Sequence, residues 1–113
     1  MSVLLDLQSS RLEVNEPDTI MVVGDVHVLA ASRLAEAGND WLSQLPREGH
    51  VVLDFSRVEK ASTAALSVLL QWVRAARRRH LSITAIILSS PLRRLSALAD
   101  ITPLLDEVVV PDR

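Results

Sequence analysis

Residues 51–70, with the sequence VVLDFSRVEKASTAALSVLL, restrict the possible folds of this chain more than any other segment. Their apolar start is typical of a buried strand, and apolar residues recur at helical spacing from Leu66 onward. The hydroxyl side chains of Ser62 and Thr63 lie where the intervening loop meets this helix. Backbone N–H groups are unpaired at a helix start, which therefore favours negative charge. We expect any docking partner or kinase of this chain to use that corner.

Strands and helices are expected to alternate along the chain. Residues 15–18 predict a turn that joins two weak strands into a hairpin. Strands that alternate with helices imply a largely parallel sheet with right-handed crossovers. We therefore predict a single α/β domain over residues 1–113, with a mixed, mostly parallel sheet of four to five strands and three to four helices. The expected elements are strands 12–14, 19–23, 51–55 and 81–88, helices 28–45, 63–79 and 92–99, a helical turn at 101–105, and a short strand or tail at 108–110.

Two features of the expected interior bear on function. The unbroken apolar run at residues 51–53 predicts a strand that is buried on both faces. In helix 63–79 the apolar sector is wider than the roughly 100° stripe that a surface helix needs. One interpretation is that this helix packs on the sheet and on a neighbouring helix. The other is that Ala64, Val68 and Trp72 face a protein partner, because Trp is favoured at interface centres.

Composition excludes several classes of protein. The chain has no Cys, which rules out disulfides and thiolate metal sites, and its three histidines lack metal-ligand spacing, so we expect no metal and no cofactor. A formal charge of −2 and an aromatic content of 3% argue against nucleic acid as a partner. A Gly-x-Ser-x-Gly motif and a Walker-type loop are both absent from the sequence, so we expect no enzymatic activity.

The apolar content indicates a protein partner rather than a membrane. Apolar residues make up 49% of the chain, yet no apolar run approaches the ~18 to 20 residues of a membrane span. The start of the chain has no basic region and contains an early acid, Asp6, so we expect no signal peptide. We predict a cytoplasmic domain without direct membrane insertion, and an apolar excess of this kind favours a permanent partner surface.

Two polar motifs have both a structural and a functional interpretation. Ser62 or Thr63 can be the N-cap of helix 63–79, or a docking or phosphorylation site, since a phosphate is tolerated at a helix start. Residues 74–80 include four arginines, which can complement the dipole at the helix end or contact phosphates. The slight negative charge of the chain and its few aromatic residues favour the dipole interpretation.

Residues 54–58 (DFSRV) and 62–66 (STAAL) resemble the central motif of the STAS domain family, which includes sulfate transporters and anti-sigma factor antagonists. In that motif a strand ends in Asp, a hydrophobic residue and Ser. After a short loop, a helix opens with Asp, Ser or Thr, Ser or Gly, Gly and Leu. The expected order of elements agrees with that of the family over residues 11–110, which implies a STAS-like domain.

Within the family, the resemblance is strongest to the STAS subunit of bacterial phospholipid-transporting ABC complexes of the Mla type. It is carried by Thr63 at the switch position, by residues 54–58 and by the tail at 104–113. It implies a non-catalytic subunit that binds and supports the ATPase at the inner membrane and so helps to maintain outer-membrane lipid asymmetry. It also implies partner binding by Lys60, Ser62, Thr63 and Ala64, with possible phosphorylation at Thr63 or Ser62.

The alternative is an anti-sigma factor antagonist that binds a kinase-like partner through the same face and is controlled by Ser/Thr phosphorylation. Two departures from the family motif bear on it. The Asp that precedes the hydroxyl residue is replaced by Ser62, and the following Gly is replaced by Ala65. In phosphorylated members this Asp helps to shape the site beside the phosphorylated residue. Its absence weakens the alternative and leaves simple docking unaffected.

Overall fold

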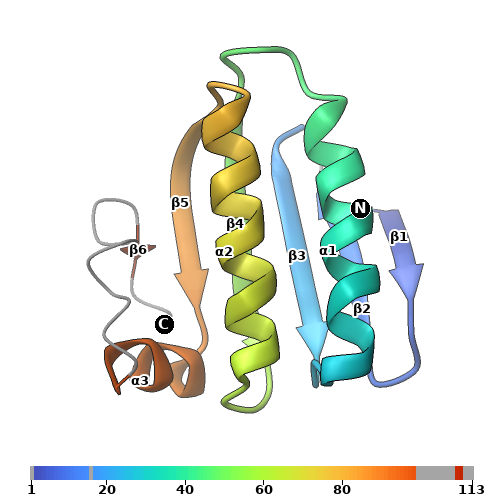
Figure 1. Cartoon of the computed structure of the whole chain (residues 1–113), viewed down its shortest axis with the longest axis vertical. Coiled ribbons are helices and arrows are strands. Elements are labelled where there is room, and N and C mark those ends of the chain that lie inside the picture. The colour runs from blue at the N-terminus through green and yellow to red at the C-terminus, as the bar shows by residue number, and fades with distance from the viewer. Residues whose placement is uncertain (1, 16, 99–108, 111–113) are drawn as a thin grey trace.

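The computed structural model describes residues 2–15, 17–98 and 109–110, which form one mixed sheet and three helices (Figure 1). The six strands lie side by side in the order of the sequence. The predicted α/β class, with a mixed and mostly parallel sheet, is confirmed. The elements are β1 (Ser2–Asp6), β2 (Ser10–Asn15), β3 (Thr19–Gly24), α1 (Val28–Ser43), β4 (His50–Val58), α2 (Thr63–Arg78), β5 (Ser82–Leu88), α3 (Ser90–Leu98) and β6 (Val109–Val110).

The sheet has an antiparallel half and a parallel half. β1, β2 and β3 form an antiparallel meander, which includes the predicted hairpin. From β3 to β6 every pairing is parallel. The predicted helical turn at 101–105 lies outside the described residues. Of the predicted strand or tail at 108–110, Val109–Val110 forms β6 and residue 108 is not described.

β1 is a strand that the sequence pattern did not predict. Its apolar residues Val3, Leu4 and Leu5 are consecutive rather than alternating, and Val3 and Leu4 are 55% and 42% exposed. Its sheet pairing is with β2, as expected of a strand at the edge. Backbone pairing therefore contributes more to this strand than side-chain burial, and hydrophobic periodicity does not detect backbone pairing.

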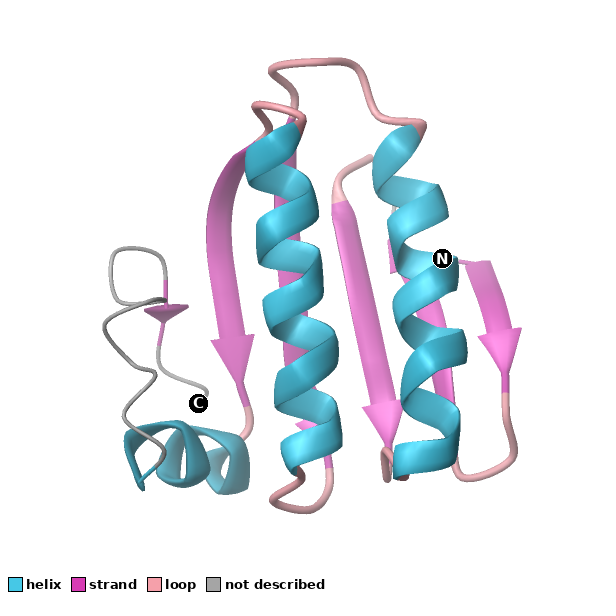
Figure 2. Ribbon diagram, viewed as in Figure 1, coloured by secondary structure: helices cyan, strands magenta, loops and turns pink. Residues whose placement is uncertain are grey.

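Figure 2 shows the two long helices, α1 and α2, side by side over the same face of the sheet. β3, β4 and β5 follow one another in a single direction, so right-handed crossovers place both helices on one side. Burial along β4 alternates accordingly: Leu53 and Phe55 are fully buried, whereas Val52 and Asp54 on the other face are half-buried. The prediction that this strand is buried on both faces was wrong, because both crossover helices cover the first face.

Trp72 lies in the core between α1 and α2. Its side chain is 0% exposed, and its indole Nε1 donates a hydrogen bond to the backbone oxygen of Ala35 at 3.1 Å. Its ring also meets Phe55 edge-on, with centroids 5.5 Å apart. Val68 is buried as well, at 1% exposure. The wide apolar sector of α2 thus packs on the sheet and on α1, and the hypothesis that Val68 and Trp72 face a partner was wrong.

The arginines at the end of α2 occupy positions that suit the helix dipole. Arg77 and Arg78 lie in the last turn, and Arg79 is the C-cap residue. The guanidinium of Arg79 also donates a hydrogen bond to the backbone oxygen of Leu45, just beyond α1, at 3.0 Å. This cluster therefore has a structural role at the end of the molecule opposite the start of α2 (Figure 1).

Candidate functional site

The candidate site lies at the edge of the sheet where the parallel strands β3 and β4 both end. Their carboxyl ends lead into the starts of α1 and α2, which therefore lie beside each other (Figure 1). The backbone N–H of Glu59 donates to the oxygen of Gly24 at 3.0 Å and so joins the two loops. This edge of an open α/β sheet is where such folds commonly bind ligands and partners.

A β-bulge shapes the end of β4. Met21 pairs with Asp54 and Val23 pairs with Arg57, so β4 has one residue more than β3 between these pairs. The carboxylate of Asp54 accepts hydrogen bonds from the backbone N–H of Ser56 at 2.9 Å and from its hydroxyl at 2.6 Å. The Asp-hydrophobic-Ser part of the sequence motif thus stabilises the bulge through which β4 enters the site.

Gly24 positions the other loop. It has a φ of 102°, a conformation that L side chains rarely adopt, and a Cβ at this position would overlap with the backbone oxygen of Ser9. The same oxygen accepts a hydrogen bond from the N–H of Asp25 at 2.9 Å. The chain leaving β3 is therefore held against the β1–β2 turn, and it places Asp25 and His27 beside the start of α2.

Ser62 is the N-cap of α2 and has a second contact as well. Its Oγ accepts a hydrogen bond from the N–H of Ala65 at 3.1 Å and donates one to the backbone oxygen of Val26 at 2.9 Å. The N-cap interpretation is confirmed for this residue. Because one hydroxyl joins both loops, Ser62 determines where the first turn of α2 lies.

Thr63, the first residue of α2, has a different environment. Its side chain is exposed, and the described part of the chain offers its hydroxyl no hydrogen bond. Ala64 is half-buried and packs against the core. The N-cap interpretation therefore applies to Ser62, whose hydroxyl the fold uses. The exposed side chain of Thr63 is the one that a partner or a kinase can reach.

A small ionic cluster borders Thr63. The ammonium of Lys60 lies 3.4 Å from Oδ2 of Asp25, and Nε2 of His27 lies 3.7 Å from the same oxygen. The side chains of Lys60 and His27 are 72% and 60% exposed, whereas that of Asp25 is 21% exposed. Asp25 is thus the half-buried centre of the cluster, and its two partners remain open to solvent.

The β3–α1 loop and the start of α2 together line one open depression of about 440 Å³. We call it the corner surface. The four residues predicted from the sequence, Lys60, Ser62, Thr63 and Ala64, all lie on it. The motif in the sequence did not indicate the contribution of the β3–α1 loop, although the rule that parallel strands end at one edge of the sheet predicts it. The lining residues from that side are Asp25, Val26, His27 and Val28.

The corner surface is open, and the exposed hydroxyl of Thr63 on it has no hydrogen-bond partner among the described residues. Within residues 2–15, 17–98 and 109–110, no group of three or more His, Cys, Asp or Glu side chains lies where it can hold a metal ion. In the same residues, no helix has the length and apolar character needed to span a membrane.

Comparison with known families gives a match over most of the chain. The family model described as "Mlab, STAS domain" matches residues 10–106. The chain belongs to the MlaB-type STAS domain family. A search of curated proteins gives no match.

The structure accounts for one departure of this STAS domain from the family motif. Where the motif has Asp before the hydroxyl residue, Ser62 accepts the capping hydrogen bond that a carboxylate can also accept, and it donates a second one to Val26. Members of this family are generally non-catalytic accessory domains.

Proposed function

We propose that this STAS domain binds the ATPase subunit of a phospholipid-transporting ABC complex of the Mla type through the corner surface. In this role it supports the assembly and activity of the complex and so helps to maintain outer-membrane lipid asymmetry. The domain then lies in the cytoplasm, peripheral to the inner membrane through its partner. The family supports this proposal, and the observation that carries it is Thr63, which is exposed at a helix start on an open surface and has no hydrogen-bond partner among the described residues.

The proposal assigns a role to each residue of the corner surface. Thr63 is the central contact, and Ala64 permits the partner to approach closely because its side chain is small. Lys60, which is 72% exposed, is a charge at the rim. Ser62 contributes indirectly, since its two hydrogen bonds hold Thr63 in position.

The test is co-expression of the chain with the ATPase of the Mla-type transporter from the same genome. We expect the two proteins to co-purify and Thr63→Glu to weaken the complex, because an unpaired carboxylate at a desolvated interface costs several kcal/mol. In the free domain the same carboxylate is exposed at a helix N-terminus, where it is favourable. The variant should therefore remain folded, as checked by circular dichroism.

Two further variants make the test specific. Thr63→Ala separates loss of the hydroxyl from gain of charge. Ser82→Glu adds the same charge at an exposed hydroxyl residue. Ser82 begins β5 and so lies at the other end of the parallel strands, and this variant should leave recovery of the ATPase unchanged. Equal recovery of the ATPase with wild type and with Thr63→Glu would contradict the role given to Thr63.

The runner-up function, an anti-sigma factor antagonist, is favoured by the same exposed hydroxyl, because a kinase can reach it. The antagonist function requires phosphorylation of Thr63 in the cell, whereas binding to the ATPase does not. Intact-mass measurement of the chain purified from its native organism distinguishes the two. A stoichiometric phosphate on Thr63, together with no association with the ATPase, would favour the antagonist.

A further inference from the structure

The first turn of α1 carries two apolar side chains that the fold does not use. Val28 and Leu29 are 76% and 87% exposed. The buried residues of this helix include Leu34, Gly38 and Leu42, and at about 100° per residue Leu29 lies nearly opposite them. Single exposed apolar side chains are common, but two adjacent ones beside a candidate binding surface need an explanation.

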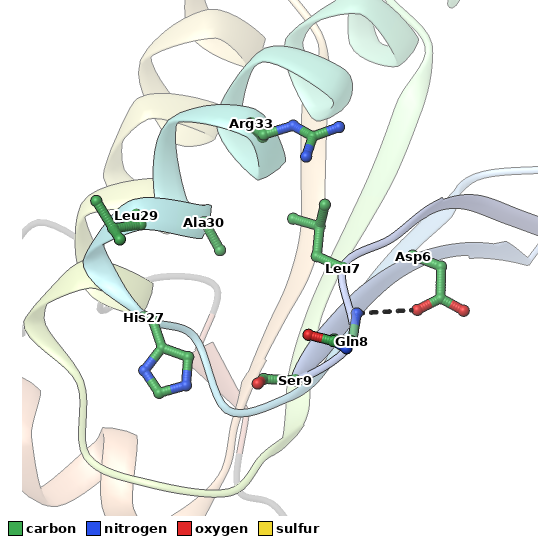
Figure 3. Close-up of a pocket in the computed structure, with 8 residues that line it drawn as sticks. All are labelled: Asp6, Leu7, Gln8, Ser9, His27, Leu29, Ala30 and Arg33. Carbon is green, nitrogen blue, oxygen red and sulfur yellow. Dashed lines mark hydrogen bonds between the residues drawn. The ribbon is translucent and has the colours of Figure 1, made fainter.

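This apolar pair is continuous with the corner surface. Val28 lines the same depression as Thr63. Leu29 lines a second hollow, of about 530 Å³, between the first turns of α1 and the β1–β2 turn (Figure 3). His27 lines both hollows. A single surface therefore runs from the start of α2, over the start of α1, to the β1–β2 turn.

The second hollow also contains a cation, the guanidinium of Arg33. Arg33 lies one turn after Leu29 on the same side of α1, and the described residues provide it with no ion pair. Asp6, at the opposite side of the hollow, points away from Arg33 in Figure 3, and its carboxylate accepts a hydrogen bond from the N–H of Gln8 at 3.3 Å. An approaching molecule thus meets an apolar side chain and a free guanidinium together.

We propose that Val28 and Leu29 are the apolar anchor of the docking surface and that Arg33 is its charged specificity contact. The inference rests on the proposed function in that the occupant is the same ATPase subunit. The matching segment of the ATPase places an apolar side chain against Leu29 and a carboxylate beside Arg33. Thr63 and the start of α1 then form adjoining parts of one interface, because Val28 and Thr63 line the same depression.

The test measures the dissociation constant between the purified ATPase and variants of the full chain by biolayer interferometry. Leu29→Ser and Arg33→Glu should each raise Kd about tenfold or more, as expected for hot-spot residues. Leu98→Ser is the matched control, because Leu98 is 85% exposed on α3 and lines neither hollow. It should leave Kd unchanged. All three side chains are exposed, so denaturant midpoints should remain at the wild-type value.

The possible outcomes separate the two proposals. If the wild-type chain does not bind the ATPase, the proposed function fails and this inference fails with it. If binding occurs and Thr63→Glu weakens it, but Leu29→Ser and Arg33→Glu bind as wild type does, only the extension onto α1 is overturned. Formation of a dimer by the isolated chain that Leu29→Ser abolishes, seen by light scattering, would identify a second copy as the occupant and would also overturn it.

Discussion

The indole ring of Trp72 occupies space that is open because residue 38 of α1 has no side chain. A Cβ on Gly38 would overlap with several atoms of the ring, and the ring cannot move outward because it is fully buried. The two helices approach closely at this point, which allows Nε1 of Trp72 to reach the backbone oxygen of Ala35. One glycine and one tryptophan therefore determine how α1 and α2 pack, and with it the spacing of their starts in the corner surface.

We expect Gly38→Ala to destabilise the domain by about 1 to 2 kcal/mol. Helix propensity favours Ala over Gly by up to about 1 kcal/mol, but overpacking of a rigid core typically costs about 1 to 3 kcal/mol, and a fully buried ring leaves little room to relax. Urea midpoints measure the change. In a Trp72→Phe background, which lacks the overlapping indole atoms, the cost should shrink. Ser32→Ala, exposed on the same helix, is the control and should be neutral or slightly stabilising.

At the scale of elements, the start of α2 carries one hydroxyl that the fold uses and one that is exposed to solvent. Ser62 caps the helix and also bonds to the β3–α1 loop, whereas Thr63 is exposed and makes no hydrogen bond with the described residues. The bulge at Asp54 and the positive φ of Gly24 position the two loops that flank this helix start. The corner surface is thus assembled from the ends of four elements, β3, α1, β4 and α2.

Alanine substitutions should distinguish the two hydroxyls. Ser62→Ala should lower the free energy of unfolding by about 1 to 2 kcal/mol, because it removes an N-cap and a bond between loops. Thr63→Ala should change it by less than about 0.5 kcal/mol, as for other exposed positions. Chemical denaturation of both variants under the same conditions is the measurement. An equal loss of stability in the two would show that Thr63 contributes to the cap and would argue against its being free for a partner.

For the whole molecule, the decisive feature is a sheet whose strands follow the order of the sequence. Each crossover adds the next parallel strand on the same side of the previous one. The helices α1 and α2 therefore cover the same face of the sheet, and they start at the same end of the strands. The core therefore lies between that face and the two helices. β3 and β4 are central strands with a neighbour on either side, whereas β1 is at the edge, with Val3 and Leu4 exposed.

Hydrogen exchange should reflect this arrangement. We expect the paired amides of β4 to exchange at rates near the global unfolding limit and those of β1 to exchange much faster, since edge strands with little buried apolar area open locally. Mass spectrometry of peptides from the exchanged chain measures both. Protection of β1 equal to that of β4 would mean that another surface covers this edge, for example that of a second copy of the chain.

Local pattern in the sequence was sufficient to predict the helices and the central strands, because hydrophobic periodicity indicates which side of an element is buried. The motif at residues 54–66 was sufficient to identify the family. The residues predicted from it, Lys60, Ser62, Thr63 and Ala64, all line the corner surface. The pattern missed β1, which depends on backbone pairing. It also left open whether Trp72 faces the core or a partner, because an apolar sector has the same pattern whether a helix or another protein covers it.

The tertiary structure decided what lies opposite each apolar face and which distant segments meet. Val26 and Ser62 are 36 residues apart, yet a hydrogen bond joins them because parallel strands end at one edge. The same geometry brings Val28 beside Thr63, and it places both helices on one face of β4. The sequence by itself determined the helices and the central strands, the family and one half of the candidate site. The other half, and the core position of Trp72, depended on contacts between segments that are remote in the chain, which local periodicity cannot encode.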